Sequence, residues 1–300
     1  MKEIISENYN LKIEKIYNKN DEMYFFINDY KIIIKKVLIS ESEISSALEI
    51  SNKLYENGYK INTIIVNKKG EYITKIKNEK IVLMRENSVI EKANLATILS
   101  IYKIEINNSV TQLSSTEDYS KIVDDVEQKI ITYNKEFKKI QNSMDYFIGL
   151  AENSIQLLDF CNKNKEIEKN TGIIINSDNI RTSFEKEIYN PLNIQIGEKE
   201  LTIANYFKWK IYTDYIDFDE LEELKKEKIN YTLLLAYLLF PNFYFNDAKM
   251  IMDNKIDEKS INKYTDKNKN YIHFLKYYIN KYIDKIDRFN KNSWINLQWQ

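Results

Sequence analysis

The sequence is poor in the residues that mark secreted, metal-binding and hydrolytic proteins. Among 300 residues there are one cysteine and one histidine. Because the single thiol, Cys161, has no partner for an internal disulfide, we expect a reducing compartment. The single imidazole, His273, lacks the neighbours that would complete a zinc site or a serine–histidine–aspartate triad. CxxC, GxSxG, HExxH and Walker A strings are also missing, which argues against the chemistries they support.

Long apolar runs and an excess of one charge are lacking as well. The longest purely apolar run, Leu233–Phe240, is far shorter than the ~20 residues that span a bilayer. Residues 1–10 contain no apolar core of signal-peptide length. The 44 basic residues against 45 acidic ones give a net charge of −1, without the basic excess of nucleic-acid binders. We therefore expect a soluble cytoplasmic protein with no membrane span and no nucleic-acid partner.

The scarcity of glycine (five) and proline (two) leaves no flexible linker, so we expect closely packed lobes. Residues 1–86 are β-rich, in the order β-β-α-β-β-β. After the first two strands, Ser40 and Glu43 form a capping box at the start of a helix, and Gly58 stands where its C-cap would lie. The expected strands are Met23–Ile27, Lys31–Val37, Ile61–Asn67, Glu71–Ile76 and Lys80–Met84.

Residues 87–300 are mainly helical. Two short strands, Gly172–Ile175 and Leu192–Ile196, interrupt the helical pattern. The expected helices include Asp118–Gln141, Asp145–Asn162, Tyr231–Phe240 and a Tyr-rich pattern over Asp257–Phe289. The fold class is therefore α+β, with a small β-rich N-lobe (1–86) and a large helical C-lobe (87–300).

Three strings carry a resemblance to a known family. They are NGYKINTIIVNKKGEYIT (Asn57–Thr74), DYFIGLAENSIQLL (Asp145–Leu158) and LLLAYLLFPNFYF (Leu233–Phe245). Together with the order of elements, they resemble the kinase-like spore-coat proteins of endospore-forming bacteria (CotS/YutH type). The resemblance implies a bilobal protein-kinase-like fold of the aminoglycoside phosphotransferase type. It also implies synthesis in the mother-cell cytoplasm, location in the spore coat, and coat proteins as partners.

Phosphoryl transfer by this fold needs a lysine for the nucleotide phosphates, with an acidic partner. Lys35 and Lys36 end the second strand, and Lys35 is our candidate, although strand alternation does not choose between them. A solvated lysine at the strand end is the alternative. Glu43, on the following helix, is a candidate partner for Lys35, and its capping role is the favoured alternative.

The catalytic segment departs from the family pattern. Active relatives carry His-Gly-Asp after a short strand, with an Asn five residues beyond the Asp. Here the segment reads Asn176-Ser177-Asp178, so the Asp is present, but Ser183 occupies the Asn position. Asp178 is the candidate catalytic residue, with a helix N-cap as the alternative. The Asp expected after the next strand is replaced by Gly197-Glu198, so we predict no metal site and a degenerate kinase, or pseudokinase.

The C-terminal aromatic residues admit two interpretations. Tyr264, Tyr271, Tyr277, Tyr278 and Tyr282, with Trp294 and Trp299, indicate either an interaction surface or the core of a long helix. The leading functional hypothesis is a pseudokinase that binds partners in spore-coat assembly, with no cofactor. The alternatives are an active phosphotransferase using ATP and Mg²⁺ on a small molecule or coat component, and a cytosolic binding module unrelated to spores.

Overall fold

The computed structural model describes residues 1–19, 22–87, 94–105, 116–133, 136–163, 171–176, 187–213 and 216–283. These residues divide into two compact units. The first unit consists of the described residues within Met1–Val110, Gly172–Ser177 and Arg181–Ile196. The second consists of those within Thr111–Thr171, Asp178–Ile180 and Gly197–Gln300. The β-rich unit thus extends past residue 86 and gains a later segment of the chain.

The first unit is built on an antiparallel sheet. Among the described residues, strands pair in the order β1-β2-β3-β6-β4, and β5 also pairs with β6. Their bounds are β1 (Tyr17–Lys19), β2 (Glu22–Ile27), β3 (Tyr30–Val37), β4 (Thr63–Ile65), β5 (Thr74–Ile76) and β6 (Glu79–Arg85). The predicted hairpin is confirmed, with Asn28 at φ 51° in its turn. The third and fourth predicted strands are shorter than expected, and β1 and helix α1 (Lys2–Tyr9) were not predicted.

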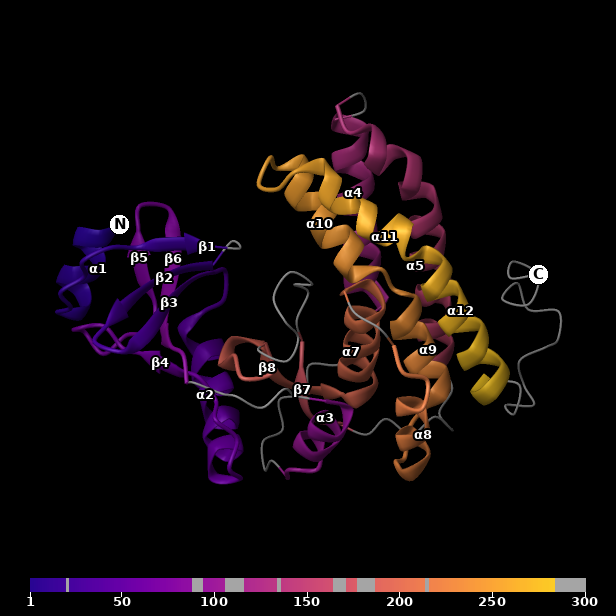
Figure 1. The fold of residues 1–300 in the computed structure, drawn as a ribbon, viewed down its shortest axis with the longest axis horizontal. Helices are drawn as coiled ribbons and strands as arrows, with labels where there is room; N and C mark the ends of the chain where they lie inside the picture. The colour runs from indigo at the N-terminus through magenta and orange to yellow at the C-terminus, as the bar shows by residue number, and fades with distance from the viewer. Residues whose placement is uncertain are drawn as a thin grey trace. The chain divides into compact units, whose positions relative to one another are not determined.

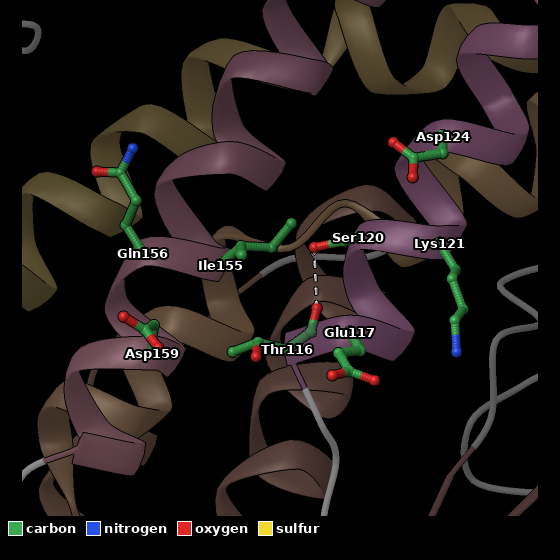
Figure 2. Close-up of a pocket in the computed structure, with 8 residues that line it drawn as sticks. All are labelled: Thr116, Glu117, Ser120, Lys121, Asp124, Ile155, Gln156 and Asp159. Carbon is green, nitrogen blue, oxygen red and sulfur yellow. Dashed lines mark hydrogen bonds between the residues drawn. The ribbon is translucent and has the colours of Figure 1, made fainter.

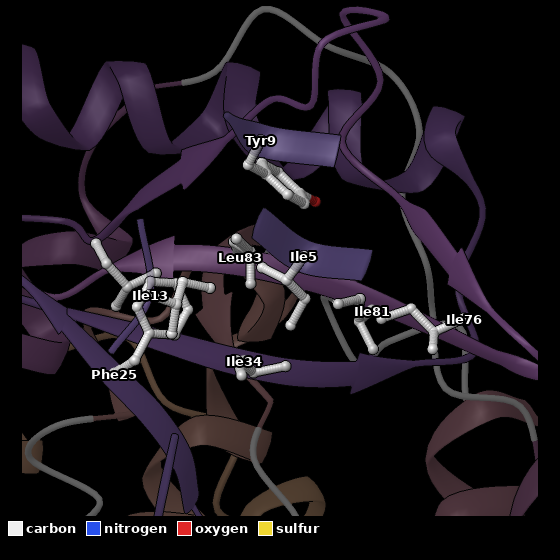
Figure 3. Packing of buried hydrophobic residues seen from close by; sticks show 9 residues of the cluster. Ile5, Tyr9, Ile13, Phe25, Ile34, Ile76, Ile81 and Leu83 are labelled. Atoms are coloured by element: carbon white, nitrogen blue, oxygen red, sulfur yellow. The ribbon is translucent and has the colours of Figure 1, made fainter. Parts of the chain in front are cut away.

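Two apolar clusters cover opposite faces of this sheet. In β6, Ile81 and Leu83 join one cluster, whereas Val82 joins the other, as strand alternation requires. Figure 3 shows the first cluster, in which α1 lies over the strands. Its members are Ile5, Tyr9, Ile13, Phe25, Ile32, Ile34, Ile76, Ile81 and Leu83. The second cluster joins the sheet to helix α2 (Glu41–Glu56) through Ile44, Ile64, Ile73 and Val82.

The capping prediction for α2 is confirmed. The Ser40 hydroxyl accepts from the Glu43 backbone N–H, and the Glu43 carboxylate accepts from the Ser40 N–H. These two bonds satisfy donors that would otherwise be orphaned at the helix start. At the other end, Gly58 has φ 90°, a conformation that suits glycine at this position.

A two-stranded sheet follows later in the chain. It pairs β7 (Thr171–Ile175) with β8 (Ile194–Glu198). The second strand begins later than predicted, because Pro191–Asn193 form a 3₁₀ turn, η1, that the Asn190 side chain caps by accepting from the Leu192 N–H. This turn packs on α2. A backbone bond from Asn62 N–H to the Tyr189 carbonyl (2.9 Å) also ties the segment to the β-rich unit.

The second unit is helical. Helix α9 packs against both α5 and α7, and α4 packs on α5 and α10 (Figure 1). The helices are α4 (Thr116–Thr132), α5 (Lys138–Lys163), α7 (Lys199–Thr213), α8 (Glu220–Glu223), α9 (Tyr231–Leu239), α10 (Asn242–Met252), α11 (Asn262–Asp266) and α12 (Asn268–Tyr278). Across the described residues, no helix combines the length and apolar character that a membrane span requires.

Two helix predictions were wrong in extent. The pattern over Asp118–Gln141 predicted one helix, but α4 ends at Thr132 and α5 begins at Lys138. The continuous pattern predicted from Asp257 is divided into a 3₁₀ turn, α11, α12 and a π-helical turn at Ile279–Ile283. Apolar periodicity does not reveal a break in a helix, because the helices on either side of the break both place an apolar face toward the core.

Four of the five tyrosines named in the C-terminal pattern form core, whereas Tyr277 is only partly buried. Tyr264, Tyr271, Tyr278 and Tyr282 are all buried. Their hydroxyls reach backbone carbonyls: Tyr264 donates to Phe243 (2.8 Å) and Tyr271 to Leu238 (2.7 Å). A buried phenol needs such a partner. Of the two interpretations, core packing holds for these four side chains, and the two C-terminal tryptophans lie outside the described residues.

Candidate functional site

Lys35 lies on the face of β3 that the α2 cluster covers. In the sheet register it stands opposite Val82, whereas Lys36 stands opposite Ile81 on the other face. Lys36 is half exposed, and its ammonium lies 2.5 Å from Glu79 at the end of the hairpin. The Lys35 side chain is only 25% exposed. The alternation that left the two lysines equivalent in sequence therefore separates them in the structure, and Lys35 is the sheltered one.

The carboxylate beside Lys35 comes from a distant part of the chain. Glu187 Oε1 lies 4.0 Å from Lys35 Nζ, and the Glu187 side chain is 8% exposed. Two amides hold this carboxylate: Asn190 Nδ2 donates to Oε2 at 3.1 Å, and Asn193 Nδ2 donates to the same oxygen. Asn193 in turn accepts the backbone N–H of Asn176 at 2.8 Å. The end of β7, the start of β8 and the β3 lysine thus form one connected polar group.

Glu43, the other candidate partner of the lysine, is occupied at the helix start. Its Oε2 accepts from both the backbone N–H and the hydroxyl of Ser40, each at 2.7 Å. These hydrogen bonds hold the pKa of the Glu43 carboxyl below its ordinary value, because they favour the ionised form. Glu43 is exposed and acts as a cap, and Glu187 is the acid that lies at Lys35.

Asp178 and Ser183 lie outside the described residues, so the structure does not place the candidate catalytic aspartate. The strand before them, β7, ends as predicted at Ile175. Glu198, at the end of β8, is 3% exposed, and its Oε2 accepts a hydrogen bond from the Tyr237 hydroxyl of α9. In the part of the chain that the structure describes, no three His, Cys, Asp or Glu side chains are arranged to hold a metal ion.

Glu187 is the site residue that the sequence analysis missed. It lies 152 positions after Lys35, at a helical position followed by a turn, and no periodicity or spacing connects the two. The only local signal is the Asn-Pro pair at Asn190-Pro191, which predicts a turn but not what the turn presents. An ion pair between such segments depends on tertiary structure, so the sequence alone does not reveal it.

A pocket lies in the second unit between α4 and α5 (Figure 2). Its volume is about 500 Å³. Three carboxylates line it, from Glu117, Asp124 and Asp159, together with one ammonium, from Lys121. Asp159 is already paired with Lys163 at 2.6 Å. The remaining balance of charge favours a cationic ligand over an anionic one.

Comparisons with known proteins identify the fold. No protein-family model matches the sequence, and no curated protein matches it either. Among solved structures, it is similar to an aminoglycoside phosphotransferase from Alicyclobacillus acidocaldarius, with 12% identity, a TM-score of 0.57, and coverage of 94% of this chain and 96% of that one. It is also similar to a spectinomycin phosphotransferase in complex with ADP and spectinomycin, with 13% identity, a TM-score of 0.56, and coverage of 88% and 92%. The chain therefore has the predicted bilobal, kinase-like α+β fold of the aminoglycoside phosphotransferases.

Proposed function

We propose that this protein is a pseudokinase that acts by binding partners, and that its setting is the assembly of the spore coat. The proposed loss of catalysis rests on the burial and hydrogen bonding of Glu198. Magnesium takes oxygen ligands in near-ideal octahedral geometry and keeps several waters. Glu198 is buried, and its Oε2 accepts from Tyr237 in the helical core, a setting unlike that of a carboxylate that faces a hydrated ion. The described residues therefore do not fit the metal.

The binding of nucleotide phosphates is a separate question from the binding of Mg²⁺. Lys35 is sheltered, is oriented by Glu187, and stands on the strand where this fold holds phosphates. The Glu187 carboxylate, 4.0 Å away, favours one direction for the Lys35 ammonium. Lys35 thus fits a phosphate group, and we propose that any nucleotide bound here is kept without turnover.

Thermal melting of the protein with ATP, with and without Mg²⁺, tests this proposal. A ligand at a hundredfold excess over its Kd stabilises the folded state by about 2.7 kcal/mol, which is a shift of a few degrees for a chain of this length. We expect either no shift or a shift that Mg²⁺ does not change, and no phosphate release. The matched pair of variants is Lys35→Ala and Lys36→Ala, adjacent lysines on opposite faces of β3.

A shift that requires Mg²⁺, is lost in Lys35→Ala and persists in Lys36→Ala would refute the pseudokinase proposal. It would favour the second candidate, an active phosphotransferase using Lys35 and Asp178. The acidic pocket of Figure 2 is the observation that favours this candidate, because Glu117 and Asp124, the carboxylates not paired with Lys163, suit an amine-bearing small molecule. The spectinomycin phosphotransferase that shares the fold was solved with its antibiotic and ADP. Turnover of ATP that depends on an added aminoglycoside would establish it.

The spore-coat setting rests on the three strings that resemble coat proteins. A fluorescent fusion made in a sporulating bacterium is expected to appear in the mother cell and then to remain with the coat fraction. A fusion distributed through vegetative cells, and absent from spores, would instead support a binding module without a role in spores.

A further inference from the structure

The first unit contains a second pocket, remote in sequence from the segment that holds Glu187. It has a volume of about 540 Å³ and lies beside the β5–β6 hairpin, the start of α2 and the loop before β5. Neither Lys35 nor Glu187 lines it. Three lysines do: Lys69 from the loop, and Lys75 and Lys80 from the two strands of the hairpin.

The placement of two of these lysines is expected to destabilise the β5–β6 hairpin. Lys75 and Lys80 are direct partners in the antiparallel register of β5 and β6. Like charges directly opposite one another destabilise a strand pair. Within the described residues, no carboxylate lies within 4.0 Å of the ammonium of Lys69, Lys75 or Lys80. The pocket therefore gathers three ammonium groups and two carboxylates without an ion pair within 4.0 Å among the described residues, and Lys80 acts on Glu43 only at longer range.

The two acidic side chains of the pocket, Glu41 and Glu71, form hydrogen bonds to the loop and not to the lysines. Both oxygens of Glu41 accept backbone N–H groups, from Tyr72 at 3.2 Å and from Ile73 at 2.7 Å. Glu71 accepts from the Asn67 side-chain amide at 3.1 Å. Each carboxylate is thus held by the loop that connects β4 to β5, and its direction is fixed by that loop.

The wall that carries Lys69 is rigid. Asn67 is buried, and its Oδ1 accepts from the backbone N–H groups of Lys69 (2.9 Å) and Glu71 (3.1 Å). Its Nδ2 also reaches the hydroxyl of buried Thr74 at 3.2 Å. A ligand that binds here does not have to order the loop, which lowers the entropic cost of binding.

We propose that this pocket binds a phosphate ester through Lys69, Lys75 and Lys80. A phosphate monoester carries about −1.5 to −2 charges near neutral pH and three acceptor oxygens, which matches three ammonium donors. Its binding neutralises the repulsion between Lys75 and Lys80. One water occupies about 30 Å³ of liquid, so a pocket of about 540 Å³ holds the group that bears the phosphate as well as the phosphate.

Two double variants of equal charge test the proposal. Lys75→Gln/Lys80→Gln removes two pocket lysines, and Lys68→Gln/Lys77→Gln removes two lysines of the same loop and hairpin that do not line the pocket. The probes are inorganic phosphate, a phosphoserine peptide and the same peptide without phosphate, measured by calorimetry at low salt. We expect the pocket variant to bind the phosphorylated probes at least tenfold more weakly than the wild type and the control variant.

Stability without ligand supplies a second measurement. The pocket variant is expected to melt at or above the temperature of the wild type, because a like-charge pair has been removed. Tighter binding of the phosphoserine peptide than of inorganic phosphate would indicate a phosphoprotein as the source, and the reverse order a small phosphorylated molecule. Equal weakening in both variants, no binding of either phosphorylated probe at millimolar concentration, or equal binding of the unphosphorylated peptide would overturn the proposal.

Discussion

The buried ammonium of Lys208 stabilises the end of helix α9, and its removal is a direct test of the helical unit. Lys208 lies on α7 and is 3% exposed. Its Nζ donates to the backbone carbonyls of Tyr237 and Phe240, both at 2.9 Å, and to Asn242 Oδ1 at 2.5 Å. The last carbonyls of a helix have no intrahelical partner, and Pro241, the next residue after Phe240, brings no N–H.

Lys208→Met keeps an unbranched apolar chain of similar length and removes the donor. The Tyr237 and Phe240 carbonyls then lose a charged partner, at about 1–3 kcal/mol each, with Phe240 at the low end because its oxygen also accepts the Asn242 N–H at 3.0 Å. Asn242 retains a bond from its Nδ2 to Asn205 Oδ1 at 3.2 Å, so it adds little to this cost. The release of the buried charge offsets part of the loss. We therefore expect the free energy of unfolding to fall by about 3 kcal/mol.

Urea unfolding, followed by near-ultraviolet circular dichroism, measures this change. The signal reports the packed tyrosines of the same unit. Lys210→Met is the matched control, since Lys210 lies on the same helix and pairs with Glu220 near the surface. Such a pair contributes at most about 1 kcal/mol. If Lys208→Met destabilises no more than Lys210→Met does, the ammonium does not satisfy the helix end and the reasoning fails.

Two further predictions concern a close backbone approach and a titrating carboxyl. Gly172→Ala places a methyl group 2.8 Å from the Tyr102 carbonyl oxygen, so we expect a loss of about 1–3 kcal/mol in unfolding free energy. Gly149→Ala, in a helix with nothing within 4 Å, is expected to stabilise by about 0.5–1 kcal/mol, and equal effects would contradict the packing argument. The hydrogen bond from Lys129 lowers the pKa of Asp253 below its ordinary value of 3.8. The stability that this bond adds is present above that value and lost as pH falls through the lowered pKa, so the advantage of the wild type over Asp253→Asn should shrink in acid melts and stay constant from pH 6 to 8.

Local physics accounts for the parts of the fold that the sequence predicted. The hairpin of β2 and β3 follows from alternating apolar residues around a turn at Asn28, and both strands appear at the expected positions. The α2 start follows from the reciprocal bonds of Ser40 and Glu43, which involve residues three positions apart. In each case the decisive interactions are near neighbours in the chain.

Predictions failed or stayed open where the decisive interaction joins residues that are far apart in the sequence. No sequence signal near Thr132 predicts the end of α4, because the apolar pattern continues into α5. For the tyrosines of the last helices, the sequence left an interaction surface open beside core packing, since their burial depends on α9 and α10. The candidate site follows the same rule: alternation placed Lys35 and Lys36 on opposite faces, but their different exposure and the approach of Glu187 to Lys35 appear only in the structure.

The proposed loss of catalysis has a cause in packing as well as in residue identity. Helix α7 begins directly after Glu198, and its charged residues Lys199, Glu200 and Lys208 are buried. Burial raises the pKa of the Glu200 carboxyl, while the backbone N–H of Asn230 donates to it at 2.9 Å. A carboxylate that served a metal at the start of this helix would have to leave partners that also hold α7 to α9. We therefore expect that a single substitution to a metal-binding residue type would not create a metal site, because buried contacts between α7 and α9 occupy this position.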